Sequence, residues 1–332
     1  MTAVETSTRM MMVREAINDA LDRALAEDEK VLLLGEDIAD PGGGVYGITK
    51  GLSTKYGLHR VRPTPISEQA IVGAAVGAAV AGYRPVAELM IMDFLGVCLD
   101  QLANHAAKLR YMSGGQTTVP LTLRCSAGAA MSLGAQHSQM LEAWLVHTPG
   151  LKVCIPSNAA DAKGMLTTCI FDDDPCVFIE QVMGYFNGSE CPEGDHRVPV
   201  GEAAVRRDGD AVTIVTYGRQ MNDAMTAAEQ LAKDGIEAEV IDLRWLQPLD
   251  TEAILGSVRK TGRLVVLHEA VKRGGLGAEI AAMVVEEAFD SLRAPIARVA
   301  GKNTPVPYAR ELEAAFLPTV AEVVAAAKGQ VS

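Results

Sequence analysis

The sequence predicts an α/β protein made of two doubly wound domains, and three observations support this fold class. Short runs rich in β-branched residues alternate with helical patterns along the whole chain. The length of 332 residues suggests about two domains. With 48% hydrophobic and 22% charged residues, the composition is that of an ordinary globular protein. Parallel strands that are buried on both faces need helices on both sides, which right-handed crossovers supply.

The first predicted domain covers residues 1–185. Its expected strands are 31–35, 84–88, 120–124, 151–155 and 175–180. Residues 68–82 are expected to form a buried helix that is too short to cross a membrane. Gly73 and Gly77 lie on one face of this helix, so another backbone can approach it closely. That face packs either on its own sheet or at a subunit interface.

A stretch rich in turn formers and acids predicts a linker at residues 186–200. The strand and helix pattern then resumes, which predicts a smaller α/β domain over 201–332. Its expected strands are 212–218, 237–243, 263–267 and 295–299.

Charge and cysteine usage exclude several classes of partner. The net charge of −12 repels polyphosphate backbones, so we expect no nucleic acid partner. None of the six cysteines forms a CxxC pair, which favours a reducing compartment. The segment 1–6 carries an acid and no apolar run, so we expect no signal or transit peptide. The expected location is the cytoplasm, with no membrane attachment.

Residues 42–47 satisfy the GxGxxG pattern and would suit a nicotinamide-binding oxidoreductase. The pattern does not directly join a strand to a helix, as a dinucleotide site requires, so a surface loop is the favoured interpretation.

Glu68 follows Pro65 and Ser67 at the predicted start of an apolar helix. An acid there stabilises the helix dipole, which is a sufficient structural explanation. Alternatively, the apolar helix shields the carboxylate from water and makes Glu68 an acid/base group. His137 lies among small and polar residues, either as part of a capping loop or with room beside it for a ligand.

Several motifs resemble the β subunit of the first component of 2-oxoacid dehydrogenase complexes, the pyruvate, branched-chain and acetoin dehydrogenase family. They are Leu-Gly-Glu-Asp (34–37), Thr-Pro-Ile-Ser-Glu (64–68), Val-Gly-Ala-Ala-Val-Gly (72–77), Tyr-Met-Ser-Gly-Gly (111–115), Ala-Gln-His-Ser-Gln (135–139), Pro-Gly-Leu-Lys-Val (149–153) and Asp-Ala-Lys-Gly (161–164).

The resemblance implies a transketolase-like fold, with a pyrimidine-binding domain followed by a transketolase C-terminal domain. It also implies an α2β2 heterotetramer that shares thiamine diphosphate between chains. The diphosphate and Mg²⁺ would be held by the α subunit through a Gly-Asp-Gly segment, which this chain lacks. A lipoyl-bearing acyltransferase component would receive the acyl unit.

The resemblance also assigns roles to residues. Glu68 matches the glutamate that hydrogen-bonds the aminopyrimidine ring and favours its imino tautomer, whose nitrogen removes the thiazolium proton. Phe94 matches the aromatic residue that stacks on the same ring, and Met90 matches an apolar neighbour of it, although core packing is an alternative role for both. His137 matches a histidine near the reacting carbon. A K⁺ site in some relatives would correspond here to Leu121, Cys169, Ile170, Asp172 and Asp174.

The substrate stays open at this point. Residues 92–98 look closer to acetoin-type β subunits than to pyruvate-type ones. A two-chain enzyme of secondary metabolism that transfers a two-carbon unit from another donor is an alternative, and a non-catalytic assembly subunit is a third.

Overall fold

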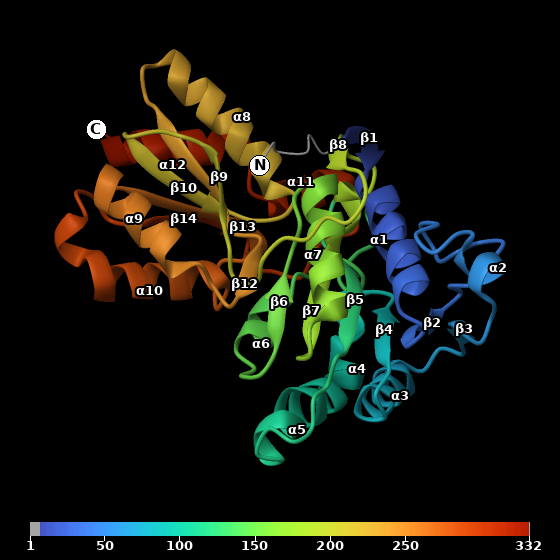
Figure 1. The fold of residues 1–332 in the computed structure, drawn as a ribbon. Coiled ribbons are helices and arrows are strands. Elements are labelled where there is room, and N and C mark those ends of the chain that lie inside the picture. Colours follow the sequence, from blue (N-terminus) through green and yellow to red (C-terminus); the bar gives the residue numbers. More distant parts are fainter. Residues whose placement is uncertain (1–6, 332) are drawn as a thin grey trace. The chain divides into compact units, whose positions relative to one another are not determined.

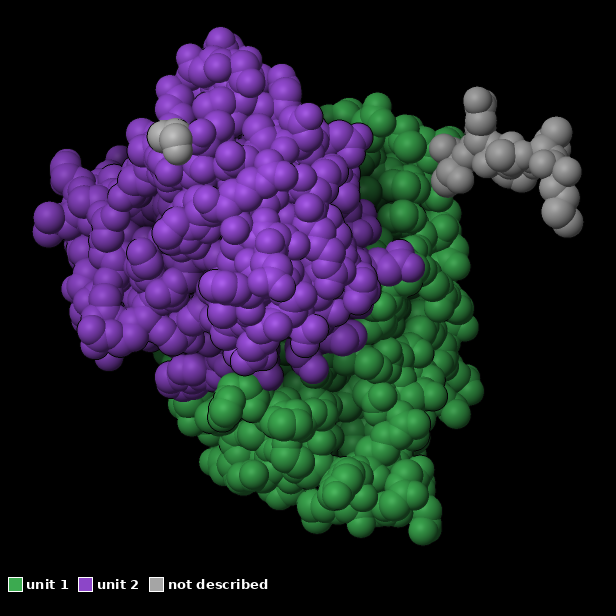
Figure 2. All heavy atoms as spheres, turned by 90° about the vertical axis from the view of Figure 1, so that its left-hand side faces the viewer, with its two compact units in different colours: residues 1–127, 147–200 green, residues 128–146, 201–332 purple. Residues whose placement is uncertain are grey.

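The computed structural model describes residues 7–331. Residues 1–6, on which the prediction about targeting peptides rests, and residue 332 lie outside the described residues. The chain divides into unit 1, residues 1–127 and 147–200, and unit 2, residues 128–146 and 201–332 (Figure 2). Residues 128–146 therefore belong with unit 2 and residues 186–200 with unit 1, which the continuous segments expected from the sequence do not anticipate.

The elements of unit 1 follow each other along the chain (Figure 1). They are β1 (Thr8–Met12), α1 (Val13–Glu27), β2 (Val31–Glu36), α2 (Leu52–Tyr56), β3 (Val61–Thr64), α3 (Glu68–Val80), β4 (Arg84–Leu89), η1 (Met92–Phe94), α4 (Leu95–Asp100), the π-helix η2 (Gln101–Ala106), α5 (Ala107–Met112), β5 (Thr122–Ala127), β6 (Lys152–Cys154), α7 (Ala159–Phe171), β7 (Cys176–Gln181), η3 (Val182–Gly184) and β8 (Gly188–Pro192).

The main sheet of unit 1 is parallel, with its strands in the order β6-β7-β5-β4-β2-β3. Strands β5 and β7 are buried at every position, their polar residues included, as expected for parallel strands that are covered on both faces. Strand β3 lies at the edge of the sheet, where Pro63 is tolerated because no further strand needs its missing N–H. The doubly wound prediction is confirmed for this unit.

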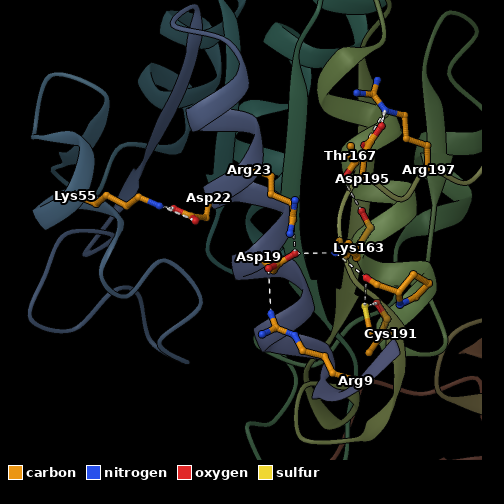
Figure 3. Close-up of polar contacts among 12 residues, drawn as sticks. Arg9, Asp19, Asp22, Arg23, Lys55, Lys163, Thr167, Cys191, Asp195 and Arg197 are labelled. Carbon is orange, nitrogen blue, oxygen red and sulfur yellow. Dashed lines mark hydrogen bonds and ion pairs between the residues drawn. The ribbon is translucent and has the colours of Figure 1, made fainter. Parts of the chain in front are cut away.

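An ion pair between the buried Lys163 and the partly buried Asp19 joins α7 to α1 (Figure 3). The Nζ of Lys163 lies 2.9 Å from the carboxylate of Asp19, and Lys163 also donates to the backbone oxygen of Pro192 at 2.7 Å. Burial alone raises the pKa of Asp19, but hydrogen bonds and charges from Lys163 and Arg23 outweigh it and lower that pKa. The lysine in the Asp-Ala-Lys-Gly motif therefore holds two helices together.

The glycine-rich loop at residues 42–47 is fixed by its own chain. A Cβ at Gly43, whose φ is +70°, would lie 2.3 Å from the backbone of Lys50, so glycine is needed there. The Asp40 carboxylate accepts the N–H groups of Gly51 at 2.6 Å and Thr54 at 2.9 Å. The loop is followed by α2, a helix of 5 residues. It therefore lacks the direct strand-to-helix junction of a dinucleotide site.

Unit 2 contains α6 (Glu142–Val146), β9 (Ala204–Arg207), β10 (Val212–Thr216), α8 (Gln220–Lys233), β11 (Ala238–Asp242), β12 (Trp245–Gln247), α9 (Thr251–Thr261), β13 (Leu264–Val271), α10 (Leu276–Ala288), η4 (Phe289–Ser291), β14 (Ala297–Gly301), α11 (Arg310–Phe316) and α12 (Val320–Val331).

Its sheet has the order β14-β13-β10-β11-β9, parallel except for the antiparallel edge strand β9. The apolar faces of α8 and α12 pack on this sheet around Ile214, Leu231 and Val323. This α/β unit confirms the predicted fold class of the second domain. Among residues 7–331, no helix is both long enough and apolar enough to cross a membrane.

Candidate active site

The strand order of unit 1 reverses between β2 and β4. From β2 the chain adds β3 on one side, then crosses back to add β4 on the other. In open α/β sheets, ligands bind beyond the carboxyl ends of the strands at such a reversal. Glu36 ends β2, Glu88 lies near the end of β4, and Glu68 begins the helix that follows β3. The topology therefore gathers acidic side chains where a ligand site is expected.

Glu68 is the first residue of α3 and is only 9% exposed. Ser67 occupies the N-cap position, but its hydroxyl donates to the backbone oxygen of Pro65 at 3.1 Å and does not cap the helix. No residue between 7 and 331 donates a hydrogen bond to the Glu68 carboxylate. The carboxylate of this largely buried residue is thus available to a donor from outside the described chain.

The negative charge of Glu68 raises the pKa of two neighbouring groups, Glu36 and Cys98. Burial raises the pKa of Glu36, and the charges of Glu68, Asp37 and Glu88 raise it further. Burial also raises the pKa of the Cys98 thiol on α4 to about 12, with the charge of Glu68 adding to the effect. The Oε1 atom of Glu36 is buried and has no hydrogen-bond partner in the described chain. A buried acceptor left unpaired costs about 1–3 kcal/mol. An N–H donor from a ligand that reaches Oε1 of Glu36 would remove this cost.

Unit 1 also contains a buried charge network centred on Arg124. Its guanidinium donates to Glu88 at 2.7 Å and, through two nitrogens, to Glu180 at 2.7 and 2.9 Å. The Tyr185 hydroxyl also donates to Glu180, at 2.6 Å. Burial raises the pKa of Glu88, against the opposing charge of Arg124.

Sequence reasoning missed this network. The available signal was the charged residue that ends each of three expected strands: Glu88 in 84–88, Arg124 in 120–124 and Glu180 in 175–180. Register then aligns them, since Glu88 pairs with Arg124 on the neighbouring strand.

Met90 and Phe94 lie on the segment that follows β4. Met90 lines a cavity of about 20 Å³ together with Glu88, Arg124 and Gly44, enough room for about one water molecule. Phe94 is half-buried, and its backbone oxygen lies one helical turn before Cys98. Both predicted apolar residues therefore lie in the same unit as Glu68, on the segment that leads into α4.

His137 belongs to unit 2. It lies between a loop with left-handed backbone and the short helix α6, and its N–H contacts the backbone oxygen of Gly134 at 3.4 Å. The predicted set is thus divided between units: Glu68, Met90 and Phe94 lie in unit 1 and His137 in unit 2.

The oxygens predicted as K⁺ ligands already accept hydrogen bonds from protein groups. Arg84 donates to the backbone oxygens of Ile170 at 3.5 Å and Asp172 at 2.9 Å. Lys152 bridges the carboxylates of Asp172 and Asp174, at 2.6 and 3.2 Å.

The remaining two predicted ligands are also engaged: the carbonyl oxygens of Leu121 and Cys169 accept the N–H groups of Cys176 and Asp172. Among residues 7–331, no group of three or more His, Cys, Asp and Glu side chains could hold a metal ion. Protein cations thus contact oxygens of Ile170, Asp172 and Asp174, and backbone N–H groups contact those of Leu121 and Cys169. The K⁺ site stays a prediction.

Two family models match the chain and together cover most of it. The transketolase pyrimidine-binding domain matches residues 9–185, and the transketolase C-terminal domain matches residues 201–323.

Curated relatives are similar over nearly their whole length. The β subunit of acetoin:2,6-dichlorophenolindophenol oxidoreductase from Cupriavidus necator is 48% identical, covering 96% of this chain and 97% of that protein. The protein of the same name from Bacillus subtilis is 46% identical, covering 95% and 96%. The mitochondrial pyruvate dehydrogenase E1 component subunit beta-2 of Oryza sativa subsp. japonica is 46% identical, covering 98% of this chain and 88% of that protein.

Among solved structures, a split-gene transketolase described as an inactive β4 tetramer aligns with a TM-score of 0.80 at 25% identity, over 97% of this chain and 98% of that one. This likeness supports the two-domain fold. Together with the family models and the relatives, it leads to one conclusion: this chain belongs to the transketolase-like family of pyruvate and acetoin dehydrogenase β subunits.

Proposed function

We propose that this chain is the β half of a thiamine-diphosphate-dependent dehydrogenase that acts on a pyruvate-like 2-oxoacid or on acetoin. An α subunit completes the enzyme, and a lipoyl-bearing second component receives the acyl unit. The observation that carries the proposal is the Glu68 carboxylate, to which no residue between 7 and 331 donates a hydrogen bond, beside the buried and unpaired Oε1 of Glu36. An aminopyrimidine ring offers N–H donors, which would satisfy these two acceptors.

Thiamine diphosphate supplies the carbanion-stabilising chemistry when it is bound. In the proposal, Glu68 holds a proton at the ring nitrogen it faces and so fixes the tautomer of the aminopyrimidine. Met90 and Phe94 provide apolar walls for this ring, and His137 moves a proton at the reacting end. The diphosphate and Mg²⁺ are assigned to the α subunit, because this chain has no Gly-Asp-Gly segment.

We propose an α2β2 assembly in the cytoplasm, and the outer face of α3 supports contact with another subunit. Ala70, Ala74, Gly77 and Val80 are exposed on this helix. A Cβ at Gly77 would meet nothing within 4 Å, so no part of the described chain packs closely there. This observation favours the interface reading of Gly77 over packing on its own sheet.

The test is Glu68→Gln in the chain reconstituted with its α subunit. The amide keeps the shape of the side chain but removes its negative charge, so assembly should persist. Proton exchange at the thiazolium carbon should slow by about 100-fold or more. Exchange at the wild-type rate would contradict the role of Glu68.

Glu252→Gln is the matched control. Glu252 is also in the first turn of a helix, α9, but lies exposed in unit 2. It tests whether losing a charge at a helix start is enough to slow the exchange, and we expect wild-type behaviour. Assays with pyruvate, branched-chain 2-oxoacids and acetoin then identify the substrate. Turnover of none of these would favour the alternative, a two-carbon donor of secondary metabolism.

A further inference from the structure

The loop that leads to His137 is held by carboxylates from distant parts of unit 2. We call residues 128–137 the His137 loop. At its start, the Oε1 atom of Glu269, near the end of β13, accepts the backbone N–H of Ala129 at 2.6 Å. A Cβ at Gly128 would lie 2.9 Å from this oxygen, and the φ of Gly128 is +98°. Glycine therefore lets the loop approach the carboxylate closely.

Glu313 on α11 binds the next turn of the loop. Its Oε1 accepts the N–H of Ala130 at 2.9 Å, and its Oε2 accepts the N–H of Ser132 at 3.0 Å. Ala130 and Ser132 have φ values of +88° and +55°, in the left-handed region that residues with a Cβ rarely adopt. Such a conformation persists only where its surroundings enforce it. Hydrogen bonds to the carboxylate of Glu313, which is 3% exposed, supply that constraint.

The segment is fixed again just beyond His137. Glu142 begins α6, and its Oε1 accepts the hydroxyl of Tyr217 at 2.6 Å, with both side chains buried. Tyr217 follows β10, a central strand of the unit 2 sheet. His137 thus lies between two anchored points, and the backbone on its N-terminal side is strained.

We propose that Glu313 and Glu269 are positioning residues for His137. They hold the strained loop in the conformation that presents the imidazole to the substrate. This inference rests on the role of His137 proposed above. If it is correct, loosening the loop weakens the chemical step while leaving cofactor binding intact.

The experiment compares Glu313→Ala and Glu313→Gln in the complex with the α subunit. Turnover of pyruvate and of acetoin is measured with 2,6-dichlorophenolindophenol as electron acceptor. Glu313→Ala should lower kcat at least tenfold, with little change in KM or in the Kd for thiamine diphosphate. Glu313→Gln should recover most of kcat, because Oε1 alone already accepts from both Ala130 and Ser132.

A second measurement does not depend on activity. In hydrogen–deuterium exchange of the complex, Glu313→Ala should speed exchange within residues 128–137 and leave the strands of unit 2 unchanged. If Glu313→Ala fails to fold, the double variant Glu313→Ala/Ala130→Gly is measured instead. Glycine adopts the φ observed at residue 130 without a steric penalty, so this variant should fold. Wild-type exchange in the loop of a folded Glu313→Ala chain would overturn the proposal.

The control is Glu322→Ala. Glu322 also accepts a backbone N–H, from Thr319 at 2.9 Å, but this bond lies at the start of α12. It should retain wild-type turnover and wild-type loop exchange, whereas a loss as large as that of Glu313→Ala would overturn the specific role of Glu313.

A double-mutant cycle separates this inference from the function on which it rests. In a His137→Ala background, Glu313→Ala should cause no further loss of kcat. Full additivity would show that Glu313 acts elsewhere. If His137→Ala alone leaves turnover unchanged, the role of His137 fails. If His137→Ala lowers turnover while Glu313→Ala does not, only the positioning role fails.

Discussion

Two sets of buried carboxylates, one in each unit, are stabilised in different ways. In unit 1, Glu88 and Glu180 face a buried cation, Arg124. In unit 2, Glu142 faces the neutral hydroxyl of Tyr217. Burial raises the pKa of Glu142 to about 7, and the hydrogen bond from Tyr217 only partly opposes the rise. The comparison shows that the partner determines whether a buried acid depends on charge pairing or on pH.

The largest effect is expected from Arg124→Met. Removing the cation leaves two buried carboxylates without their partner, which should cost about 3–5 kcal/mol in the free energy of unfolding. Urea denaturation measures this loss. Arg23→Met removes a half-exposed partner of Asp19 on the same helix and should cost at most about 1 kcal/mol. If both variants lost the same free energy of unfolding, the buried pairing of Arg124 would stabilise the fold no more than a surface ion pair does.

A smaller, pH-dependent effect is expected from Glu142→Gln. Because the pKa of Glu142 is raised in the folded state, proton binding by this group stabilises the fold at low pH. That contribution is complete below the unfolded pKa, near 4.5, and is lost as the pH rises through about 7. Glutamine has no proton to lose and still accepts from Tyr217. The unfolding free energy of Glu142→Gln relative to wild type should therefore rise by about 3 kcal/mol between pH 4.5 and pH 8.

Chemical denaturation across this pH range provides the measurement. Glu279→Gln, an exposed acid in the first turn of α10, serves as the control and should track the wild type at every pH. A flat difference for Glu142→Gln would mean that Glu142 keeps an ordinary pKa in the folded protein.

The smallest effect is expected on exchanging NaCl for KCl. Arg84 and Lys152 already occupy the oxygens around residues 170–174. At equal ionic strength, screening is also the same. The unfolding free energy should change by less than about 0.5 kcal/mol. A saturable stabilisation by K⁺, strengthened by Lys152→Met, would instead support the cation site suggested by the family resemblance.

Local signals in the sequence predicted much of unit 1. The apolar strands and the helix start at Glu68 are visible in runs of a few residues, and the structure places α3 at Glu68–Val80. Strand β3 was missed because Arg62 and Pro63 break the β-rich pattern by which strands are predicted. Strands β1 and β8 were missed because they pair residues such as Arg9 and Cys191, which are remote in sequence.

The supports of the candidate site were harder to predict for the same reason. Arg124 and Glu180 meet only through strand register, and Glu313 reaches the His137 loop from 181 residues away. No local pattern encodes these contacts. The family motifs predict roles for Glu68 and His137, but they indicate neither the network around Arg124 nor the contacts of Glu313 with the His137 loop.

The glycine-rich loop of unit 1 has a consequence for ligand binding. Hydrogen bonds from Thr54 and Gly51 hold the pKa of Asp40 well below its usual range, so this anchor stays charged at any physiological pH. Gly44, on the anchored loop, lines the cavity beside Met90 and Glu88. The loop is therefore held by contacts within this chain. Assembly with an α subunit and cofactor would lose little conformational entropy in this segment, which favours fast and tight association.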